Sequence, residues 1–277
     1  MKRHGSITKT IELACGQCHG CRLERSRQWA TRCIHESQMH AQNCFITLTY
    51  DDDHLPQRGQ LNYSDFQKFM KRLRKKTHPI KVRFYLGAEY GEQNERPHFH
   101  ACLFNHDWHD KEFLTKSPTG AKIYTSKTLQ ELWPYGYSST AELTFQSAAY
   151  VARYCMQKVT GKAAEEHYKR QDENGEYQLT PEFNKMSLKP GIGAGWLDKY
   201  EADVYSHDHV IVNGVACTPP KYYDKLLKRR NPERIEELKN ERELNGLKHR
   251  SDNTEDRLRI KEIVAKAKTK ALLRNKI

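Results

Sequence analysis

Residues 80–104 read IKVRFYLGAEYGEQNERPHFHACLF, and this stretch decides the fold. Apolar side chains alternate with others along residues 80–90, which predicts a strand. Residues 91–97 are polar and suit a turn, and residues 97–104 form a second strand. Because the connection is short, we expect the two strands to pair antiparallel as a hairpin.

Further strands and helices flank this hairpin. Residues 43–50 are β-branched and aromatic, which predicts a buried strand, and residues 136–144 suit another. Four helices are expected: over residues 22–42, over 64–76 with Ser64 and Gln67 forming a capping box, a short one begun by Ser126, and one over 148–160 capped by Ser147. Residues 161–178 are polar and typical of a loop. This order predicts an α+β fold with a ferredoxin-like antiparallel sheet, helices on one face and the other face open for a ligand.

The segment His98-Phe99-His100 places two imidazoles on one face of its strand, because strand side chains alternate with a period of two. Glu89 ends the preceding strand, so closure of the hairpin brings its carboxylate opposite the pair. Two imidazoles and one carboxylate form an open site for a divalent metal ion. A His-x-His pair alone is weak evidence, and the alternative is two exposed histidines on a solvent face.

Tyr150 and Tyr154 are four residues apart, so they lie on one face of the predicted helix, and Lys158 continues the same stripe. Two hydroxyls and a cation on one stripe suit phosphoryl transfer. Tyrosine is a weak nucleophile near neutral pH, because its ordinary pKa is about 10, and a metal ion that polarises the phosphate compensates for this. The alternative is a pair of amphipathic tyrosines at the boundary of the core.

Three cysteines at x₂ spacing, Cys15, Cys18 and Cys21, lie on a loop that contains glycine. With Cys33 they could supply the four ligands of a tetrahedral Zn²⁺ site. Free thiols in a tight turn are the alternative. The remaining cysteines of the predicted strands and helices look like small core residues.

The chain has 277 residues and a formal net charge of +12, which indicates an anionic partner, most often nucleic acid. No stretch approaches the ~18 uncharged apolar residues of a spanning helix, and residues 1–10 lack the apolar core of a signal peptide, which argues against membrane and secreted classes. Residues 221–277 hold 18 basic and 10 acidic side chains. They predict one or two exposed helices, either a solvated appendage or a clamp on a phosphate backbone.

The motifs together resemble a known family. The strand at residues 45–49, the set Glu89…His98-Phe99-His100 and Tyr150-x-x-x-Tyr154 are similar to the HUH endonucleases of rolling-circle replication. Within that group the chain most resembles replication initiators of the Microviridae, small single-stranded DNA bacteriophages, in the gokushovirus branch. The segments Cys15-x-x-Cys18-x-x-Cys21-Arg22, Trp133-x-x-Gly136 and Pro190-Gly191-Ile192-Gly193 share this likeness, which covers residues 15–196.

The resemblance implies a role for each motif. Glu89, His98 and His100 would bind Mg²⁺ or Mn²⁺, and Tyr150 and Tyr154 would be the two nucleophiles of a DNA nickase that works through a 5′-phosphotyrosyl intermediate. Relatives often place Lys between their tyrosines, whereas this chain has Arg153 there and Lys158 afterwards, which leaves open which cation serves the phosphate.

The resemblance also implies an organisation and a set of partners. Residues 1–42 would form a Cys-rich loop and leading helix, 43–200 the HUH endonuclease domain, and 201–277 an extension with a charged helical tail. The expected partners are single-stranded origin DNA and a host helicase and polymerase, in the cytoplasm of a bacterial host.

Three other functions remain open from the sequence. A zinc-dependent, non-catalytic nucleic-acid-binding protein would explain the cysteines and the basic tail. An HUH plasmid initiator, relaxase or transposase of another mobile element would share the chemistry. A metal-dependent hydrolase that releases a free 5′-phosphate would form no covalent link to DNA.

Overall fold

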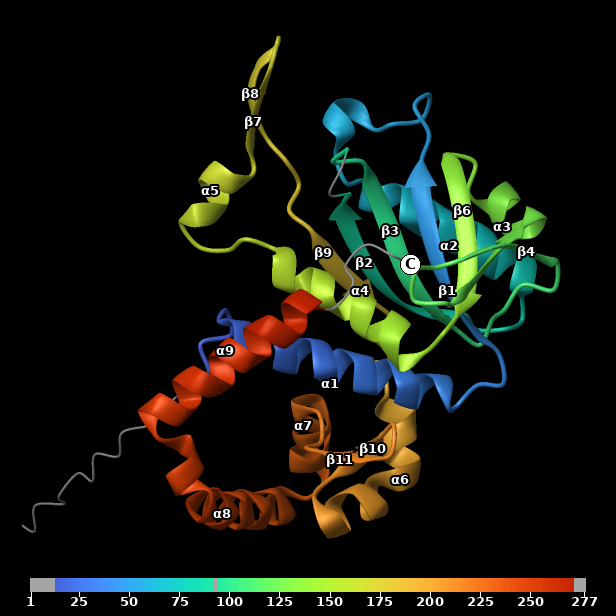
Figure 1. Cartoon of the computed structure of the whole chain (residues 1–277). Helices are drawn as coiled ribbons and strands as arrows, with labels where there is room; N and C mark the ends of the chain where they lie inside the picture. The colour runs from blue at the N-terminus through green and yellow to red at the C-terminus, as the bar shows by residue number, and fades with distance from the viewer. Residues whose placement is uncertain (1–12, 92–93, 272–277) are drawn as a thin grey trace, which may run out of the picture.

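The computed structural model describes residues 13–91 and 94–271, without the side chains of residues 154–157 and 271. Its centre is a seven-stranded sheet in the order β4-β5-β6-β1-β3-β2-β9, in which all neighbouring strands are antiparallel (Figure 1). The strands are β1 (Asn43–Tyr50), β2 (Arg83–Tyr90), β3 (Pro97–Phe104), β4 (Lys111–Lys116), β5 (Lys122–Ser126), β6 (Gly136–Glu142) and β9 (Phe183–Met186).

The central strands have the expected connectivity. β2 and β3 form the predicted hairpin, and β3 lies between β1 and β2. Helix α2 (Tyr63–Thr77) connects β1 to β2, and α3 (Lys127–Leu132) precedes β6. This is the strand order of a split βαβ unit. The hairpin β4–β5, which follows β3, was not predicted.

One face of the sheet packs against α2 and α3. The cluster on this face includes Phe66 and Phe69 of α2, Leu129 of α3 and Trp133, all fully buried. Helix α2 begins earlier than predicted, because the side chain of Asn62 accepts a hydrogen bond from the Ser64 backbone and is the N-cap. The expected capping box on Ser64 is therefore wrong. Ser126 caps α3 as predicted, accepting from the Leu129 backbone.

The second face is also covered, which corrects the expectation of helices on one face. Phe45, Tyr85, Cys102 and Phe104 project from it, and α1 (His19–Ser37) and α4 (Phe145–Gln157) bury them. Apolar side chains on both faces of the central strands require a cover on both. Figure 1 shows α1 and α4 side by side below the sheet.

Helix α4 also has different ends from those predicted. Thr144 is its N-cap, and Ser147 occupies the third helical position of a capping box. At the other end Lys158 is the C-cap with extended backbone, so the helix stops before residue 160. Both Thr144 and Ser147 can cap, and the reciprocal pair of hydrogen bonds decides the start.

Residues 161–178, predicted as a loop, contain α5 (Ala163–His167) and the hairpin of β7 (Lys169–Asp172) and β8 (Gly175–Gln178). A Gly at positive φ in the two-residue turn makes this short polar hairpin possible.

The C-terminal region has a core of its own. It comprises α6 (Ala194–His207), the hairpin of β10 (Val210–Val212) and β11 (Val215–Cys217), α7 (Lys221–Arg230), α8 (Pro232–Lys248) and α9 (Glu255–Ala271). Tyr223, Leu227, Ile235 and Leu238 of α7 and α8 are buried against α6, so only part of the charged tail is exposed as predicted.

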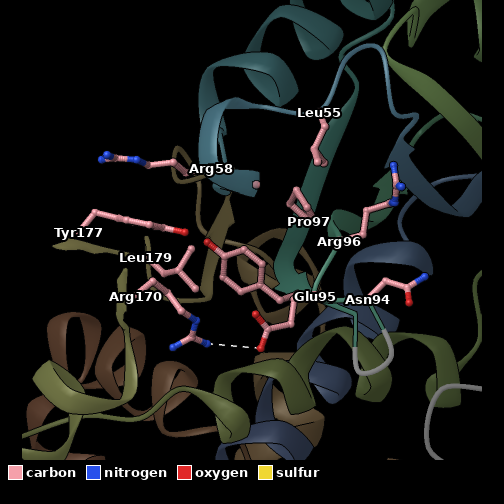
Figure 2. Close-up of a pocket in the computed structure, with 11 residues that line it drawn as sticks. Leu55, Arg58, Asn94, Glu95, Arg96, Pro97, Arg170, Tyr177 and Leu179 are labelled. Atoms are coloured by element: carbon pink, nitrogen blue, oxygen red, sulfur yellow. Dashed lines mark hydrogen bonds and ion pairs between the residues drawn. The ribbon is translucent and has the colours of Figure 1, made fainter. Parts of the chain in front are cut away.

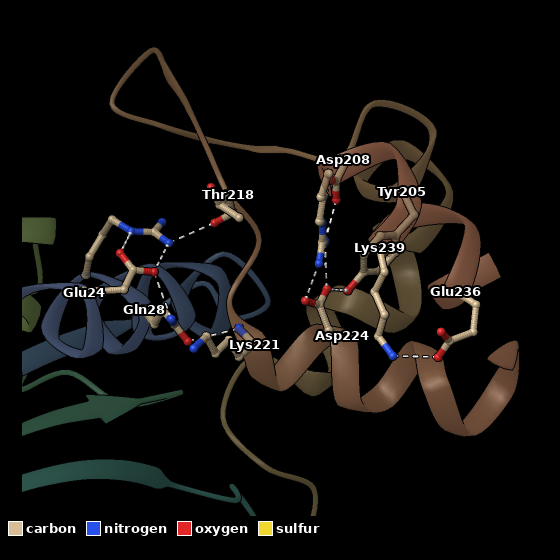
Figure 3. Close-up of polar contacts among 11 residues, drawn as sticks. Glu24, Gln28, Tyr205, Asp208, Thr218, Lys221, Asp224, Glu236 and Lys239 are labelled. Carbon is tan, nitrogen blue, oxygen red and sulfur yellow. Dashed lines mark hydrogen bonds and ion pairs between the residues drawn. The ribbon is translucent and has the colours of Figure 1, made fainter. Parts of the chain in front are cut away.

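Arginines join these C-terminal helices to one another. Figure 3 shows Asp208 and Asp224 side by side, and the guanidinium of Arg242 in α8 pairs with both, at 2.6 and 2.8 Å. Part of the positive charge of the tail is thus neutralised within the protein. None of the helices in the described part of the chain has both the length and the apolar composition needed to cross a bilayer.

Candidate active site

The sheet face beneath α4 carries two rows of polar side chains. Residues directly opposite one another in antiparallel strands project to the same face. The first row crosses four strands as Glu89, His98, Thr49 and Tyr137, and the second as Gly87, His100, Thr47 and Ser139. Along the same strands the face then becomes apolar and buried under α1 and α4. The polar rows therefore lie at the open end of this face, where Thr49 and Ser139 are half-buried.

Glu89, His98 and His100 converge on one point. Glu89 Oε1 lies 2.9 Å from His98 Nε2 and 3.0 Å from His100 Nε2. The side chains of Glu89 and His100 are 5% and 4% exposed, whereas that of His98 is 16% exposed. Solvent or substrate thus reaches the cluster from the side of His98.

The other ring nitrogen of each histidine has its own partner. His98 Nδ1 donates to the carbonyl oxygen of Arg96 at 2.9 Å, since a carbonyl only accepts. His100 Nδ1 lies 3.0 Å from Oγ1 of Thr47. Such contacts fix the rotation of metal-binding imidazoles and leave Nε2 as the ligand atom.

Burial and hydrogen bonding set the charges of the cluster. Burial raises the pKa of Glu89, but hydrogen bonds with His100 and His98 outweigh it and hold the pKa below its ordinary value. Burial lowers the pKa of His100. An ionised carboxylate and a neutral imidazole then face each other, which is the protonation state that metal binding requires. Two nitrogens and one oxygen, one from each residue and all within 4.8 Å of one another, fit a divalent cation with open coordination positions.

Tyr150 of α4 lies directly against this cluster. Its ring centroid is 5.1 Å from that of His100, edge to face at 83°, and 6.4 Å from that of Phe45. The guanidinium of Arg153 lies 5.9 Å from the Tyr150 ring. The residue is 8% exposed, so it stands at the border between the apolar core and the polar rows.

The other two residues of the predicted stripe are placed less closely. Tyr154 follows Tyr150 by one turn of α4, and its side chain lies outside the described part of the structure. Lys158 is the C-cap of α4 and leaves the helical stripe, so the expectation that it continues the stripe is wrong. The structure thus brings Glu89, His98, His100 and Tyr150 together, with Arg153 beside them.

A pocket that the sequence did not indicate opens beside His98. It has a volume of about 230 Å³ and is lined by three arginines and two tyrosines, namely Arg58, Arg96, Arg170, Tyr90 and Tyr177, and by Glu95 among others. Figure 2 shows Arg170 reaching Glu95, at 3.4 Å. Arg96 links the pocket to the cluster through its carbonyl bond to His98. The arginines come from distant parts of the chain, so no local motif could announce them.

Tyr137 was also missed. It stands in the row of Glu89 and His98 but is 70% exposed, an unusual position for an aromatic side chain. The alternation of residues 136–144 assigns Tyr137 to one face of its strand, but only the pairing register assigns it to the face of the histidines.

The N-terminal cysteines are brought together only in part. The Sγ atoms of Cys15, Cys18 and Cys21 lie within 4.8 Å of one another. Cys33 is fully buried in the core beneath α1. Twelve helical residues separate Cys33 from Cys21, a rise of about 18 Å, so the expectation that it joins this cluster is wrong.

Comparisons with known proteins agree with these motifs. Residues 43–160 match the family model of the phage replication-associated protein ORF2. The chain is 34% identical to replication-associated protein VP4 of Bdellovibrio phage phiMH2K, over 89% of this chain and 79% of the relative. It is also 34% identical to replication-associated protein ORF2 of Spiroplasma virus 4, over 78% and 68%. Replication-associated protein ORF4 of Chlamydia phage 1 is 28% identical, over 79% and 54%. No solved structure matches the chain.

Proposed function

This chain belongs to the family of phage replication-associated proteins, of gokushovirus type, and we propose that it is a nickase with an HUH endonuclease fold that initiates rolling-circle replication. The observation that carries the proposal is the contact of Tyr150 with His100 in a Glu-His-His cluster. A nucleophile beside a metal site that opens onto a polar sheet face suits cleavage of a phosphodiester.

Glu89, His98 and His100 would hold Mg²⁺ or Mn²⁺, which supplies Lewis acidity to the scissile phosphate. Tyr150 Oη attacks the phosphorus, forming an O–P bond while the bond to the 3′ oxygen breaks. The tyrosine gives up its proton, and the 3′ oxygen ends as a hydroxyl that can prime synthesis. The 5′-phosphotyrosyl link retains the energy of the phosphodiester, so rejoining needs no nucleotide cofactor.

Tyr154 is assigned the second cleavage, after a round of synthesis has regenerated the origin. The hydroxyl freed by that cleavage attacks the first phosphotyrosyl link and closes the circle. Arg153, beside Tyr150, and Lys158, at the end of α4, are the candidate cations for the charge that develops on the phosphate.

Single-stranded DNA is assigned a path across the open end of the sheet face. Tyr137 offers an exposed ring in the row of His98, two strands and about 10 Å away. The arginine-lined pocket lies on the other side of His98. An aromatic stacking surface and guanidinium groups on either side of a cleavage site are typical of proteins that hold single strands.

The remaining expectations form part of the same proposal. Residues 43–200 act as the endonuclease domain, preceded by the Cys-rich segment of residues 1–42 and followed by the extension of residues 201–277. Unwinding and synthesis fall to a helicase and a polymerase of the bacterial host, in whose cytoplasm the protein acts.

The test is cleavage of an origin oligonucleotide labelled at its 3′ or 5′ end, with Mn²⁺, resolved on a denaturing protein gel. Wild type is compared with Tyr150→Phe, Tyr154→Phe, the double variant and His98→Ala/His100→Ala. Tyr200→Phe, in α6 and outside the sheet, is the matched control. We expect a metal-dependent adduct that carries the 3′ label, lost in the double tyrosine and histidine variants and retained in the control.

Other outcomes would favour other functions. Cleavage without an adduct would indicate a hydrolase. Salt-sensitive binding without cleavage, unchanged by the tyrosine substitutions, would indicate a non-catalytic binding protein.

A further inference from the structure

The loop before α1 gathers three thiols that nicking does not use. Cys15, Cys18 and Cys21 each place Sγ within 4.8 Å of the others, and the Cys15 and Cys21 sulfurs are 3.9 Å apart. A bonded pair would be about 2.05 Å apart, and all three cysteines are free. The loop therefore brings the thiols together without joining them.

The spacing of the sulfurs fits one small ion. In a tetrahedral site with Zn–S bonds of about 2.3 Å, neighbouring sulfurs are about 3.8 Å apart. The distance between Cys15 and Cys21 is close to that value. One mononuclear ion would then be in contact with all three sulfurs after small rotations of the side chains.

The backbone of the loop favours thiolates over thiols. The Cys18 backbone N–H donates to Cys15 Sγ at 3.2 Å, and the Cys21 N–H donates to Cys18 Sγ at 3.5 Å. Cys18 is the N-cap of α1, so the positive end of the helix dipole faces the cluster. Backbone hydrogen bonds from Cys18 and Gln17 lower the pKa of the exposed Cys15 thiol to about 7.

We infer that Cys15, Cys18 and Cys21 bind one Zn²⁺ as a structural site. A tetrahedral site takes a fourth donor, which among the described residues is not a fourth Cys, His, Asp or Glu, so a water or a group from outside the described ranges completes it. Nothing in the nicking chemistry proposed above depends on this ion.

The position of the site says what the ion would stabilise. His19, the first residue of α1, contacts Thr269 of α9 at 3.0 Å. Farther along α1, the Ser26 hydroxyl donates to the carbonyl of Ala149 in α4 at 3.3 Å. An ion at the start of α1 would fix the end of a helix that supports both α9 and the tyrosine helix.

The test measures zinc bound to the full-length chain, purified without chelator, by inductively coupled plasma mass spectrometry. His98→Ala/His100→Ala is used as the background, so that the other candidate metal site does not contribute. Cys15→Ser, Cys18→Ser and Cys21→Ser are compared with Cys217→Ser, a partly exposed cysteine outside the cluster. We expect one zinc per chain in the background and the control, and at least a tenfold loss in the three variants.

Two further readouts separate a thiolate site from adventitious zinc. Replacement by Co²⁺ should give a near-ultraviolet thiolate-to-cobalt band that Cys18→Ser lacks. A chelator should lower Tm in the background and the control but not in Cys18→Ser, with increased hydrogen exchange in the first turn of α1. Absence of bound zinc, bound iron with a visible cluster absorption, or an equal loss in Cys217→Ser would overturn the inference.

Discussion

Thr47 is the side-chain partner that orients a candidate metal ligand. Its hydroxyl lies 3.0 Å from His100 Nδ1, and the ring of His100 is in turn packed between Phe45 and Tyr150. Without this hydroxyl the buried Nδ1 would lose its partner and the ring its preferred rotation.

Thr47→Val should therefore weaken Mn²⁺ binding about 10- to 100-fold, the usual effect of removing such a partner, with little change in shape. Isothermal titration calorimetry measures it. The control is Thr49→Val, the same change two residues along β1, opposite His98, whose Nδ1 is satisfied by the Arg96 carbonyl. Equal losses in both variants would contradict the role given to Thr47.

His35 is buried away from the candidate site. Its ring stacks on Trp196 at 3.5 Å, and Nδ1 lies 2.9 Å from the Tyr223 hydroxyl. Burial lowers the pKa of His35 to about 3, so the folded protein keeps this imidazole neutral at neutral pH.

In the unfolded chain the same group binds a proton near its ordinary pKa of about 6.5. Stability is therefore complete above pH 6.5 and falls by up to about 1.4 kcal/mol per pH unit as the pH drops toward 3. His35→Gln should show a shallower fall over this window, measured by urea denaturation from pH 7 to pH 4.5. The same slope in both proteins would show that His35 is not the group responsible.

The turn at residues 190–193 joins three elements. Arg32 of α1 donates to the Ile192 carbonyl at 3.0 Å, and Glu36 of α1 accepts from the Gly193 backbone at 2.7 Å. Glu36 also pairs with Arg83 of β2 at 2.6 Å. The glycine-rich segment thus fastens α6 to α1 and to the sheet.

Gly193 has a φ of +79°, and a Cβ there would lie 2.6 Å from the Tyr223 hydroxyl. Gly193→Ala should lower the free energy of unfolding by about 1–3 kcal/mol through backbone strain, with displacement of Tyr223 in addition. Gly195→Ala, two residues later in α6, meets nothing within 4 Å and should be neutral or slightly stabilising. Urea denaturation of the two variants decides between strain at one position and general intolerance of the turn.

The molecule as a whole combines a net charge of +12 with one open polar sheet end. In the C-terminal helices many arginines are paired with acids, as Arg230 is with Glu201 at 2.7 Å. The sheet end with Tyr137 and the nearby arginine pocket is therefore the surface to which we assign DNA binding, ahead of the charged tail.

Tyr137→Ala should reduce the affinity for a single-stranded oligonucleotide by about 1–3 kcal/mol, the usual value of one stacked base. Tyr137→Phe should retain the affinity, because it keeps the ring. Fluorescence anisotropy with a labelled oligonucleotide measures both. Equal losses in Ala and Phe would assign the effect to the hydroxyl rather than to stacking.

Arg170→Gln tests the other side of the cluster. Loss of one phosphate contact should flatten the slope of log K against log salt by about 0.7 for a single strand. Tyr137→Ala should leave that slope unchanged, since stacking releases no counterions. An unchanged slope in Arg170→Gln would mean that Arg170 serves only its ion pair with Glu95.

The sequence by itself determined the local parts of this protein. Alternation in residues 80–104 placed β3 with its correct bounds, put both histidines on one face and set Glu89 opposite them. It did not distinguish Thr144 from Ser147 as a cap, or Asn62 from Ser64, because neighbouring residues of similar chemistry compete within one turn.

Only the tertiary structure decided which surfaces meet. It covered the second sheet face with α1 and α4, set Tyr150 against His100, drew Cys33 into the core and gathered three distant arginines into a pocket. Side-chain direction repeats over a few residues and is visible in any short segment. The choice of which helix covers which face depends on burying apolar surface from residues far apart in the chain, and no local pattern contains that information.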